Sequence, residues 1–147
     1  MQMKNSILLS ICLLTFLIST AQKESVEKVW FNAEKTSKIQ IFKATDGNFY
    51  GKVIWIKEPN DKTGKPKLDY NNKEEKLRTQ PIMGLTIIKK FKKGSSANEF
   101  EDGTVYDPIS GKTYCGTLSV NGKELKLRGF VCGFSFIGRS SVWTLAE

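Results

Sequence analysis

The chain of 147 residues contains no histidine at all. This excludes Ser–His–Asp triads, Cys–His dyads and zinc sites ligated by histidine. The sequence also lacks a phosphate-binding loop, a dinucleotide-binding fingerprint and an EF-hand calcium loop. Residues 133–138 come near the Gly-x-Ser-x-Gly pattern of a hydrolase nucleophile but carry one residue too many. We therefore expect a protein that is not an enzyme and that holds neither a metal nor a cofactor.

A long apolar run occurs only once, near the N-terminus. It spans residues 7–18. Lys4 precedes it, and the small residues 19–21 follow it. This is the pattern of a secretory signal peptide, and the run is shorter than the ~20 residues that a membrane-spanning helix needs. We expect residues 1–21 to be cleaved before Gln22, and residues 22–147 to form a single domain in the periplasm.

Helical periodicity is scarce, and the rest of the chain consists of strand-like runs separated by turn residues. The turns at residues 46–48, 94–96 and 121–122 contain Asp, Gly, Asn or Ser, which supply positive φ or side-chain-to-backbone bonds. Evenly spaced strands joined by hairpins predict an all-β fold, an eight-stranded antiparallel up-and-down barrel whose interior holds side chains or one small ligand. The predicted strands cover residues 27–33, 37–45, 48–56, 82–92, 98–106, 112–120, 123–132 and 137–145.

The strongest hairpin signal is Asn121-Gly122, which lies between two alternating runs. A type I′ turn over these two residues pairs Leu118 with Leu125 and Cys115 with Arg128. Alternation then gives the hairpin one apolar and one polar face, as expected of a sheet packed on a core on one side. The predicted apolar face holds Leu118, Val120, Leu125, Leu127 and Val131, and the polar face holds Thr117, Ser119, Glu124, Lys126 and Arg128.

Three motifs follow one another in the same region. They are D-P-x-x-G-K-x-Y at residues 107–114, L-K-L-R-G-F at 125–130 and G-R-x-x-x-W at 138–143. Together with segments 47–53, 62–66 and 80–85, they resemble the bacterial domain-of-unknown-function 2147 family over nearly the whole mature chain. The resemblance implies an exported domain with a lipocalin-like β-barrel and no established activity.

The resemblance to lipocalins has a further consequence at the closure of the barrel. In lipocalins an arginine of the closing strand packs over a tryptophan of the opening strand. The resemblance implies that Arg139 packs over Trp30 here, in a cation–π contact expected to be worth ~1 kcal/mol. Such a pair closes the barrel and is not a binding site.

One long connection, residues 57–81, separates the third predicted strand from the fourth. Connections of this length are uncommon and are usually either functional or mobile. Residues 72–78 predict one or two helical turns with Asn72 as the N-terminal cap. Two interpretations stay open: a lid over the barrel mouth, or a surface loop without a specific role.

Two cysteines, Cys115 and Cys132, lie outside the leader. An even number of cysteines in an exported protein favours a disulfide. The predicted register opposes it, because Cys132 would lie four residues, or ~13 Å, from the partner of Cys115, beyond the ~7 Å limit between Cα atoms. A bridge would need a β-bulge at one of the nearby glycines. The register thus favours two free thiols, and a disulfide stays open as the alternative.

Removal of the leader would leave a net charge of +7, because the leader contains one basic residue and no acidic one. The basic residues are spread along the chain, and their one cluster, residues 89–93, lies at a strand end where lysines usually solvate a turn. We expect no nucleic-acid partner. Peripheral contact with components of the cell envelope suits this charge, and the sequence predicts no oligomeric state.

Aromatic side chains offer the main positive hint of function. Most of them are expected to fill the barrel, and some could line a cavity in which a tyrosine or Arg128 orients a ligand. The candidate ligand-binding residues are Tyr50, Trp55, Arg128 and Phe130. The aromatic residues considered are Trp30, Phe42, Phe49, Tyr50, Trp55, Tyr106, Tyr114, Phe130, Phe134, Phe136 and Trp143.

Two functions follow from these features. The first hypothesis is a periplasmic barrel that binds a small apolar or amphipathic molecule, such as a lipid that bears a carboxylate. The alternative is a cell-envelope interaction module with a filled barrel, which acts through its basic surface and long loop. A hollow barrel would favour the first function, and a solid core would favour the second.

Overall fold

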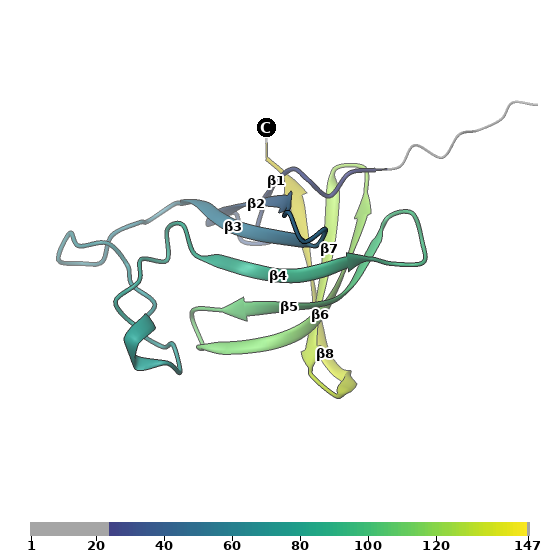
Figure 1. The fold of residues 1–147 in the computed structure, drawn as a ribbon. Helices are drawn as coiled ribbons and strands as arrows, with labels where there is room; N and C mark the ends of the chain where they lie inside the picture. The colour runs from purple at the N-terminus through teal and green to yellow at the C-terminus, as the bar shows by residue number, and fades with distance from the viewer. Residues whose placement is uncertain (1–23, 147) are drawn as a thin grey trace, which may run out of the picture.

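A computed structural model describes residues 24–146, and the predicted signal peptide lies outside this range. The described residues form eight strands and one short 3₁₀ helix, η1 (Figure 1). Within this range, no helix is both long and apolar enough to span a membrane. In chain order the elements are β1 (Val29–Phe31), β2 (Ser37–Lys43), β3 (Phe49–Ile56), η1 (Glu75–Leu77), β4 (Thr86–Lys93), β5 (Glu99–Asp107), β6 (Lys112–Asn121), β7 (Glu124–Val131) and β8 (Phe134–Leu145).

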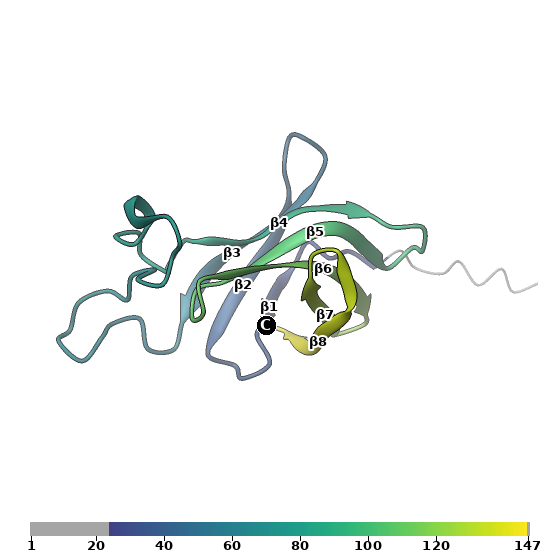
Figure 2. The same cartoon turned by 90° about the horizontal axis from the view of Figure 1, so that it is seen from below.

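The eight strands close into one antiparallel barrel. Each strand pairs with the next one in the sequence, and the last strand, β8, pairs with the first, β1 (Figures 1 and 2). This confirms the predicted all-β, up-and-down architecture. Closure uses only two residue pairs, Trp30 with Leu145 and Phe31 with Thr144. The earlier part of β8 pairs with β7 alone, and the β7–β8 hairpin projects from the barrel (Figure 1).

The β6–β7 hairpin differs from its predicted register. Its two-residue loop is Gly122-Lys123, and Asn121 pairs with Glu124. Gly122 has φ 59°, and a glycine with positive φ at the first loop position is typical of a type II′ turn. The predicted type I′ turn over Asn121-Gly122 is therefore wrong. The slip moves every partner by two residues, so each side chain keeps its predicted face.

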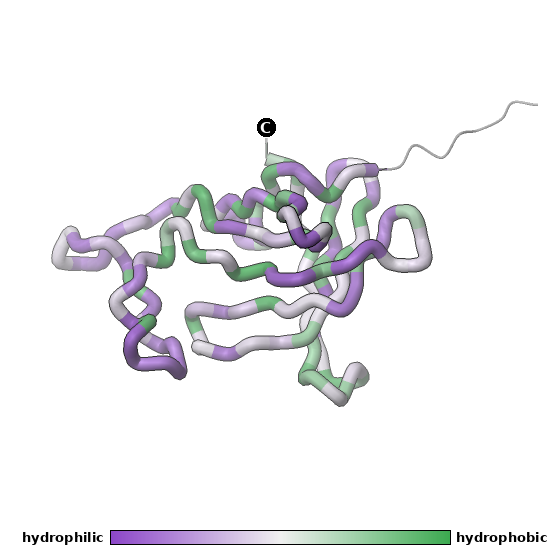
Figure 3. The backbone as a smooth tube through the Cα atoms, in the orientation of Figure 1, coloured by the Kyte–Doolittle hydropathy of each residue, from purple (hydrophilic) through white to green (hydrophobic). Residues whose placement is uncertain are grey.

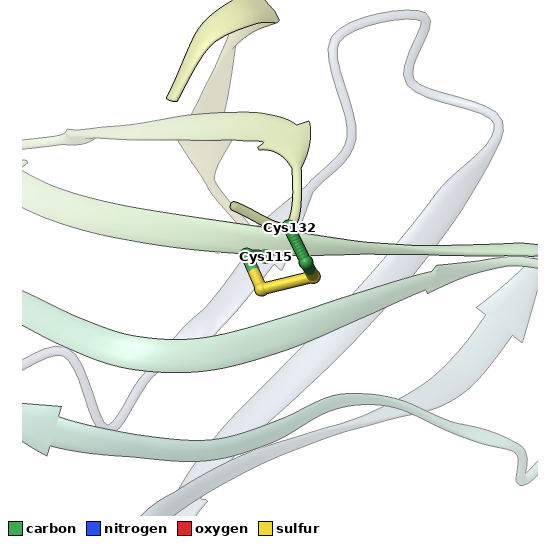
Figure 4. Close-up of a disulfide and its surroundings, with 2 residues drawn as sticks. All are labelled: Cys115 and Cys132. Carbon is green, nitrogen blue, oxygen red and sulfur yellow. A yellow bond between two sulfur atoms is a disulfide. The ribbon is translucent and has the colours of Figure 1, made fainter. Parts of the chain in front are cut away.

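This slip also overturns the prediction of two free thiols. Cys115 pairs with Phe130 rather than with Arg128, so Cys132 is only two residues from its partner position. The Cα atoms of Cys115 and Cys132 are 5.0 Å apart, and the two residues form a disulfide (Figure 4). No bulge in β6–β7 is needed, because the correct register already brings the two cysteines within the range of a disulfide.

Apolar side chains fill the barrel interior. Trp30, Ile88 and Phe91 are fully buried, at 0% exposure. The ring of Phe91 occupies the space above two glycines of β5 and β6. A Cβ atom at Gly103 would overlap this ring, and one at Gly116 would lie 3.2 Å from its Cζ atom. The two glycines therefore leave no hollow beside Phe91, because its ring fills the space that larger side chains would occupy at these positions.

Fewer aromatic residues enter this core than expected. Of the eleven considered in the sequence, only Trp30, Phe49 and Trp143 are buried. Aliphatic residues occupy most inward positions, and many rings occupy the alternate, outward positions of the same strands. The expectation that most of these aromatics fill the barrel is therefore wrong.

Two further expectations for β7 and β8 are also wrong. Val131 is 42% exposed and lies where the β7–β8 register shifts. Arg139 pairs with Gly129 and is exposed, whereas Trp30 pairs with Leu145 at the far end of β8. The cation over the Trp30 ring is the Lys28 ammonium, 5.9 Å from the ring centroid.

Residues 57–85 connect β3 to β4 and contain local structure of their own. Two isolated bridges, Asn60 with Pro66 and Leu68 with Pro81, fold the connection back on itself. It also contains η1, which confirms a helical turn within residues 72–78, but the residue at the N-terminal cap is Glu74 and not the predicted Asn72. The connection extends from the barrel beside the β5–β6 turn (Figures 1 and 2).

Candidate functional site

Tyr50 lies on the outer surface, where it pairs with Phe42 of the neighbouring strand. The two rings are stacked, with their centroids 6.2 Å apart. The Tyr50 hydroxyl donates a 2.7 Å hydrogen bond to the carboxylate of Asp46 in the preceding turn. This bond raises the pKa of Tyr50, and hydrogen bonds from the Asn48 backbone and from Tyr50 lower the pKa of Asp46. Tyr50 thus braces the β2–β3 turn and does not line an interior cavity.

Trp55 is turned outward by a β-bulge. Val53 pairs with Ile39 and Trp55 pairs with Lys38, so Ile54 is an extra residue on β3. Simple alternation would place Trp55 on the inward face of Val53. Instead, its ring lies edge to face with that of Phe31, at 6.0 Å, and the Lys38 ammonium lies 5.5 Å from its centroid. Trp55 belongs to a surface cluster, and sequence alternation alone could not reveal the bulge.

Arg128 lines a groove of about 230 Å³ on the outer wall over β5, β6 and β7. Lys126, Glu99 and Glu101 share this groove, so its walls carry charges of both signs. One guanidinium nitrogen of Arg128 donates a 2.8 Å hydrogen bond to the Ser135 carbonyl in β8. The polar face of the β6–β7 hairpin therefore points outward, as predicted, and Arg128 does not reach the barrel interior.

Phe130 lies on the same face of β7 as Arg128 and covers Gly138 of β8. A Cβ atom at Gly138 would lie only 2.7 Å from the Cβ atom of Phe130, so the glycine makes room for the ring. Tyr50 and Trp55 belong to β3, which is not a neighbour of β7 in the barrel. The four predicted residues therefore occupy two separate parts of the outer surface and do not form one pocket.

A second hollow, of about 380 Å³, lies where the connection 57–85 joins β4. Lys89 is the one ionisable residue among those that line it, so the hollow offers no acid–base pair. Both hollows lie outside the barrel wall. The lining residues of the second hollow are Gln80, Pro81, Met83, Gly84, Leu85, Thr86 and Lys89.

A buried carboxylate, which sequence analysis missed, holds the connection 57–85 to the barrel. Asp69 is fully buried at 0% exposure. Its Oδ1 atom accepts a 2.7 Å hydrogen bond from the Tyr106 hydroxyl, and its Oδ2 atom accepts one of 2.7 Å from Asn72. Nearby, the Asn71 amide donates a 2.7 Å hydrogen bond to the Ile109 carbonyl in the β5–β6 turn. We call this set of contacts the clasp.

The chemistry of the clasp is structural. Burial raises the pKa of the Tyr106 hydroxyl well above its usual range, and the hydrogen bond to Asp69 raises it further. Both carboxylate oxygens of Asp69 already accept hydrogen bonds, so its burial is compensated. Tyr106 is 37 residues from Asp69 in the chain, and an aspartate in a polar loop carries no sequence signal of such a partner.

Sequence analysis also missed an exposed apolar surface at the end of the β7–β8 hairpin. We define the hairpin tip as residues 131–137. Its apolar members, Val131, Phe134, Phe136 and Ile137, are 42%, 53%, 78% and 51% exposed. Figure 3 shows the tip as an apolar projection below the barrel. The signal was present in the sequence as three large apolar residues within four positions, Phe134 to Ile137, but alternation assigned part of it to a core strand.

Within the described part of the chain, no three Cys, Asp or Glu side chains are grouped so that they could hold a metal ion. Two other surface features, the charged groove and the hairpin tip, lie next to each other on β7 and β8. The groove offers charges of both signs, and the tip offers apolar surface.

Comparison with known proteins places the chain in a family. A family model described as an uncharacterised protein conserved in bacteria, DUF2147, matches residues 29–145. None of the curated protein sequences compared with this chain matches it. A solved structure with the same fold is that of protein HP1028 from the human pathogen Helicobacter pylori, which belongs to the lipocalin family. It has a TM-score of 0.73 and 20% sequence identity over 84% of each chain.

The two comparisons agree with the geometry. The likeness to HP1028 shows that the closed eight-stranded barrel is lipocalin-like. The family match extends from the first residue of β1 to the last residue of β8, and so includes the whole barrel. The protein therefore belongs to the DUF2147 family of uncharacterised bacterial proteins.

Proposed function

We propose that this protein is an exported, lipocalin-like barrel that acts through its outer surface as a binding module of the cell envelope. The observation that carries this proposal is the filled interior. Buried apolar side chains form one continuous core, and Phe91 takes the space over Gly103 and Gly116. A ligand of even moderate size would have to displace a packed ring, at a cost similar to that of disrupting a core.

The outer surface, by contrast, carries the features that a binding module needs. The groove over β5–β7 and the hairpin tip are both exposed and adjoin each other through Arg128, which lines the groove and binds the Ser135 carbonyl at the tip. Large exposed apolar residues grouped in one place are typical of interaction sites. We infer a binding role rather than catalysis, because the sequence has no histidine and the buried carboxylate of the clasp is committed to structural bonds.

Two features support the periplasm as the compartment. The first 21 residues have the pattern of a signal peptide. The Cys115–Cys132 disulfide suits an oxidising compartment, since disulfides are rare in the reducing cytosol of bacteria.

The second candidate function is binding of a small amphipathic ligand, and the lipocalin-like fold favours it. In this case the ligand would use the outer groove, where Arg128 could meet a carboxylate and Phe130 follows on the same strand face. Glu99 and Glu101 in the same groove oppose an anionic ligand, so we rank this function second.

Native mass spectrometry of the protein purified from its own envelope separates the two functions. We expect the mass of the bare, disulfide-bonded chain, without an extractable small molecule. A reproducible additional mass that solvent extracts as a defined lipid or metabolite would contradict the proposal and would support the second candidate. Because a disulfide lowers the mass by about two daltons, the same spectrum checks the Cys115–Cys132 bond.

A further inference from the structure

The hairpin tip exposes large apolar side chains on both of its faces. Phe136 and Ile137 are consecutive in β8, so their side chains point to opposite sides of the strand. They are 78% and 51% exposed. Phe134, 53% exposed, packs edge to face against Phe136 with a centroid distance of 6.0 Å. A folded partner that rested on one face of this hairpin would leave the other face in water.

Three contacts hold the tip in this exposed position. The Cys132 end of the disulfide lies in the tip and the Cys115 end lies in β6 of the barrel (Figure 4). Arg128 binds the Ser135 carbonyl, and Phe130 packs on Gly138 at the base of the tip. The apolar side chains are thus presented on a fixed projection instead of folding back onto the barrel.

The chain segment that carries the tip is basic, whereas Glu99 and Glu101 of β5 line the adjoining groove. Between residues 125 and 146 the chain has three basic residues, Lys126, Arg128 and Arg139, and no acidic residue. Arg139 is exposed two positions beyond the last residue of the tip. An anionic surface would be attracted by these charges, whereas another basic copy of this chain would be repelled.

We propose that the hairpin tip inserts its apolar side chains into the surface of an anionic membrane, with Arg139 and its basic neighbours at the headgroups. This inference rests on the proposed function, because it names the partner of the outer surface. A lipid surface fits better than a folded protein, since fluid lipid can surround both faces of a narrow projection. Apolar insertion combined with basic flanks is also the usual chemistry of proteins that bind one leaflet.

The test measures partitioning onto vesicles of phosphatidylethanolamine with phosphatidylglycerol, and onto vesicles of phosphatidylcholine alone. The protein is purified from cells that express the full chain. We expect binding to the anionic vesicles that weakens as salt is raised. F134S/F136S should reduce this partitioning by at least about tenfold, because two exposed rings no longer enter lipid. R139Q should reduce it about fivefold on anionic vesicles and very little on neutral ones.

Two matched control variants make the same kinds of substitution, an apolar residue to serine and a basic residue to glutamine, at positions outside the tip. I109S removes an apolar side chain that is 84% exposed at the β5–β6 turn, away from the tip. K62Q removes an exposed charge in the connection 57–85. Both should partition within about twofold of the unchanged protein, since each side chain lies outside the proposed contact. Equal losses in the control and tip variants would overturn the proposal.

The depth of insertion distinguishes a docked tip from simple electrostatic adsorption. In F136W, the new indole should shift its fluorescence to shorter wavelength on anionic vesicles, and brominated acyl chains should quench it. An indole that stays in water while the protein binds would overturn insertion. The molecular mass in solution gives one more outcome. A stable dimer that F134S/F136S dissociates would also overturn membrane insertion, because a second copy of the chain would then cover the tip.

Failure here is distinguishable from failure of the proposed function. If the protein ignores both vesicle types and its native mass is that of the bare chain, the membrane inference fails and another surface partner must be sought. If the native mass includes a small ligand, the proposed function itself fails, whatever the vesicles show.

Discussion

Two phenylalanines summarise the contrast between the barrel interior and the hairpin tip. Phe91 is completely buried over two wall glycines, whereas Phe136 is 78% exposed at the end of the β7–β8 hairpin. The same side chain is therefore used in opposite ways within one small domain. Packing explains the position of Phe91, because the neighbouring glycines leave room for its ring.

Packing does not explain the position of Phe136. Its burial would require the tip to fold back, and the disulfide between Cys132 and Cys115 instead fixes the tip to β6. The difference indicates that the interior serves stability, and the proposed membrane contact lies on a braced projection instead.

The largest expected effect is a loss of stability when Phe91 is replaced, and replacement of Phe136 should not cause it. Phe91→Ala should lower the free energy of unfolding by about 3–5 kcal/mol, because it leaves a cavity in a packed core. Phe136→Ala should change it by no more than about 0.5 kcal/mol, since the side chain is mostly in water already. Equilibrium denaturation in urea measures both values. A small loss for Phe91→Ala would mean that the interior tolerates a cavity, and would favour a hollow, ligand-binding barrel.

Removal of the disulfide should have the next largest effect. The two cysteines are 17 residues apart in the sequence, and a cross-link of this length contributes about 3 kcal/mol by restricting the unfolded chain. The double variant Cys115→Ser/Cys132→Ser should lose about this amount in denaturation experiments. Addition of a reductant should destabilise the unchanged protein by a similar amount and leave the double variant unaffected. A reductant effect on the variant would show that the loss has another cause.

The clasp is a polar counterpart to the apolar tip. Asp69→Asn should destabilise the protein by about 1–3 kcal/mol, because one of two buried hydrogen bonds to the carboxylate is lost or weakened. Hydrogen exchange should rise in residues 57–85 and remain unchanged in β6 and β7. Glu58→Gln, which removes an exposed ion pair to Lys67, should have almost no effect on either measurement. Uniformly faster exchange throughout the barrel would contradict a local clasp.

The smallest predicted effect appears at alkaline pH. Because burial and Asp69 raise the pKa of Tyr106 in the folded state, its contribution to stability is complete below the unfolded pKa of 10.0. The contribution is lost as pH rises above that value toward the folded pKa. Tyr106→Phe should therefore reduce the decline of stability above pH 10, and Tyr70→Phe, at an exposed position, should retain it. Identical alkaline slopes in the two variants would show that Tyr106 is not the group responsible.

The sequence was sufficient to predict the barrel, because its evidence is local. Alternating apolar residues and turn-forming residues identified all eight strands, and only their ends moved. The predicted β6–β7 register was wrong because two adjacent pairs of residues, Asn121-Gly122 and Gly122-Lys123, both suit a tight hairpin loop, and the structure uses the second. A register shift of two residues preserves every face, so the predicted core of this hairpin is correct apart from Val131, whereas the predicted free thiols are wrong.

The candidate site was less predictable, because it depends on contacts between distant residues and on irregular backbone. One bulge in β3 turned Trp55 outward, and alternation gives no warning of it. The clasp joins Asp69 to Tyr106 across 37 residues. The exposure of the tip depends on where β8 leaves the barrel, which is set by its pairing with the short strand β1.

Methyl NMR of the labelled protein, titrated with anionic bicelles, tests the contrast between interior and tip most directly. The account predicts that signals of Val131 and Ile137 at the tip will change, while those of Ile88 and Leu118 in the interior will not. Changes centred on Ile88 and Leu118 would contradict it, because they would show that lipid enters the barrel.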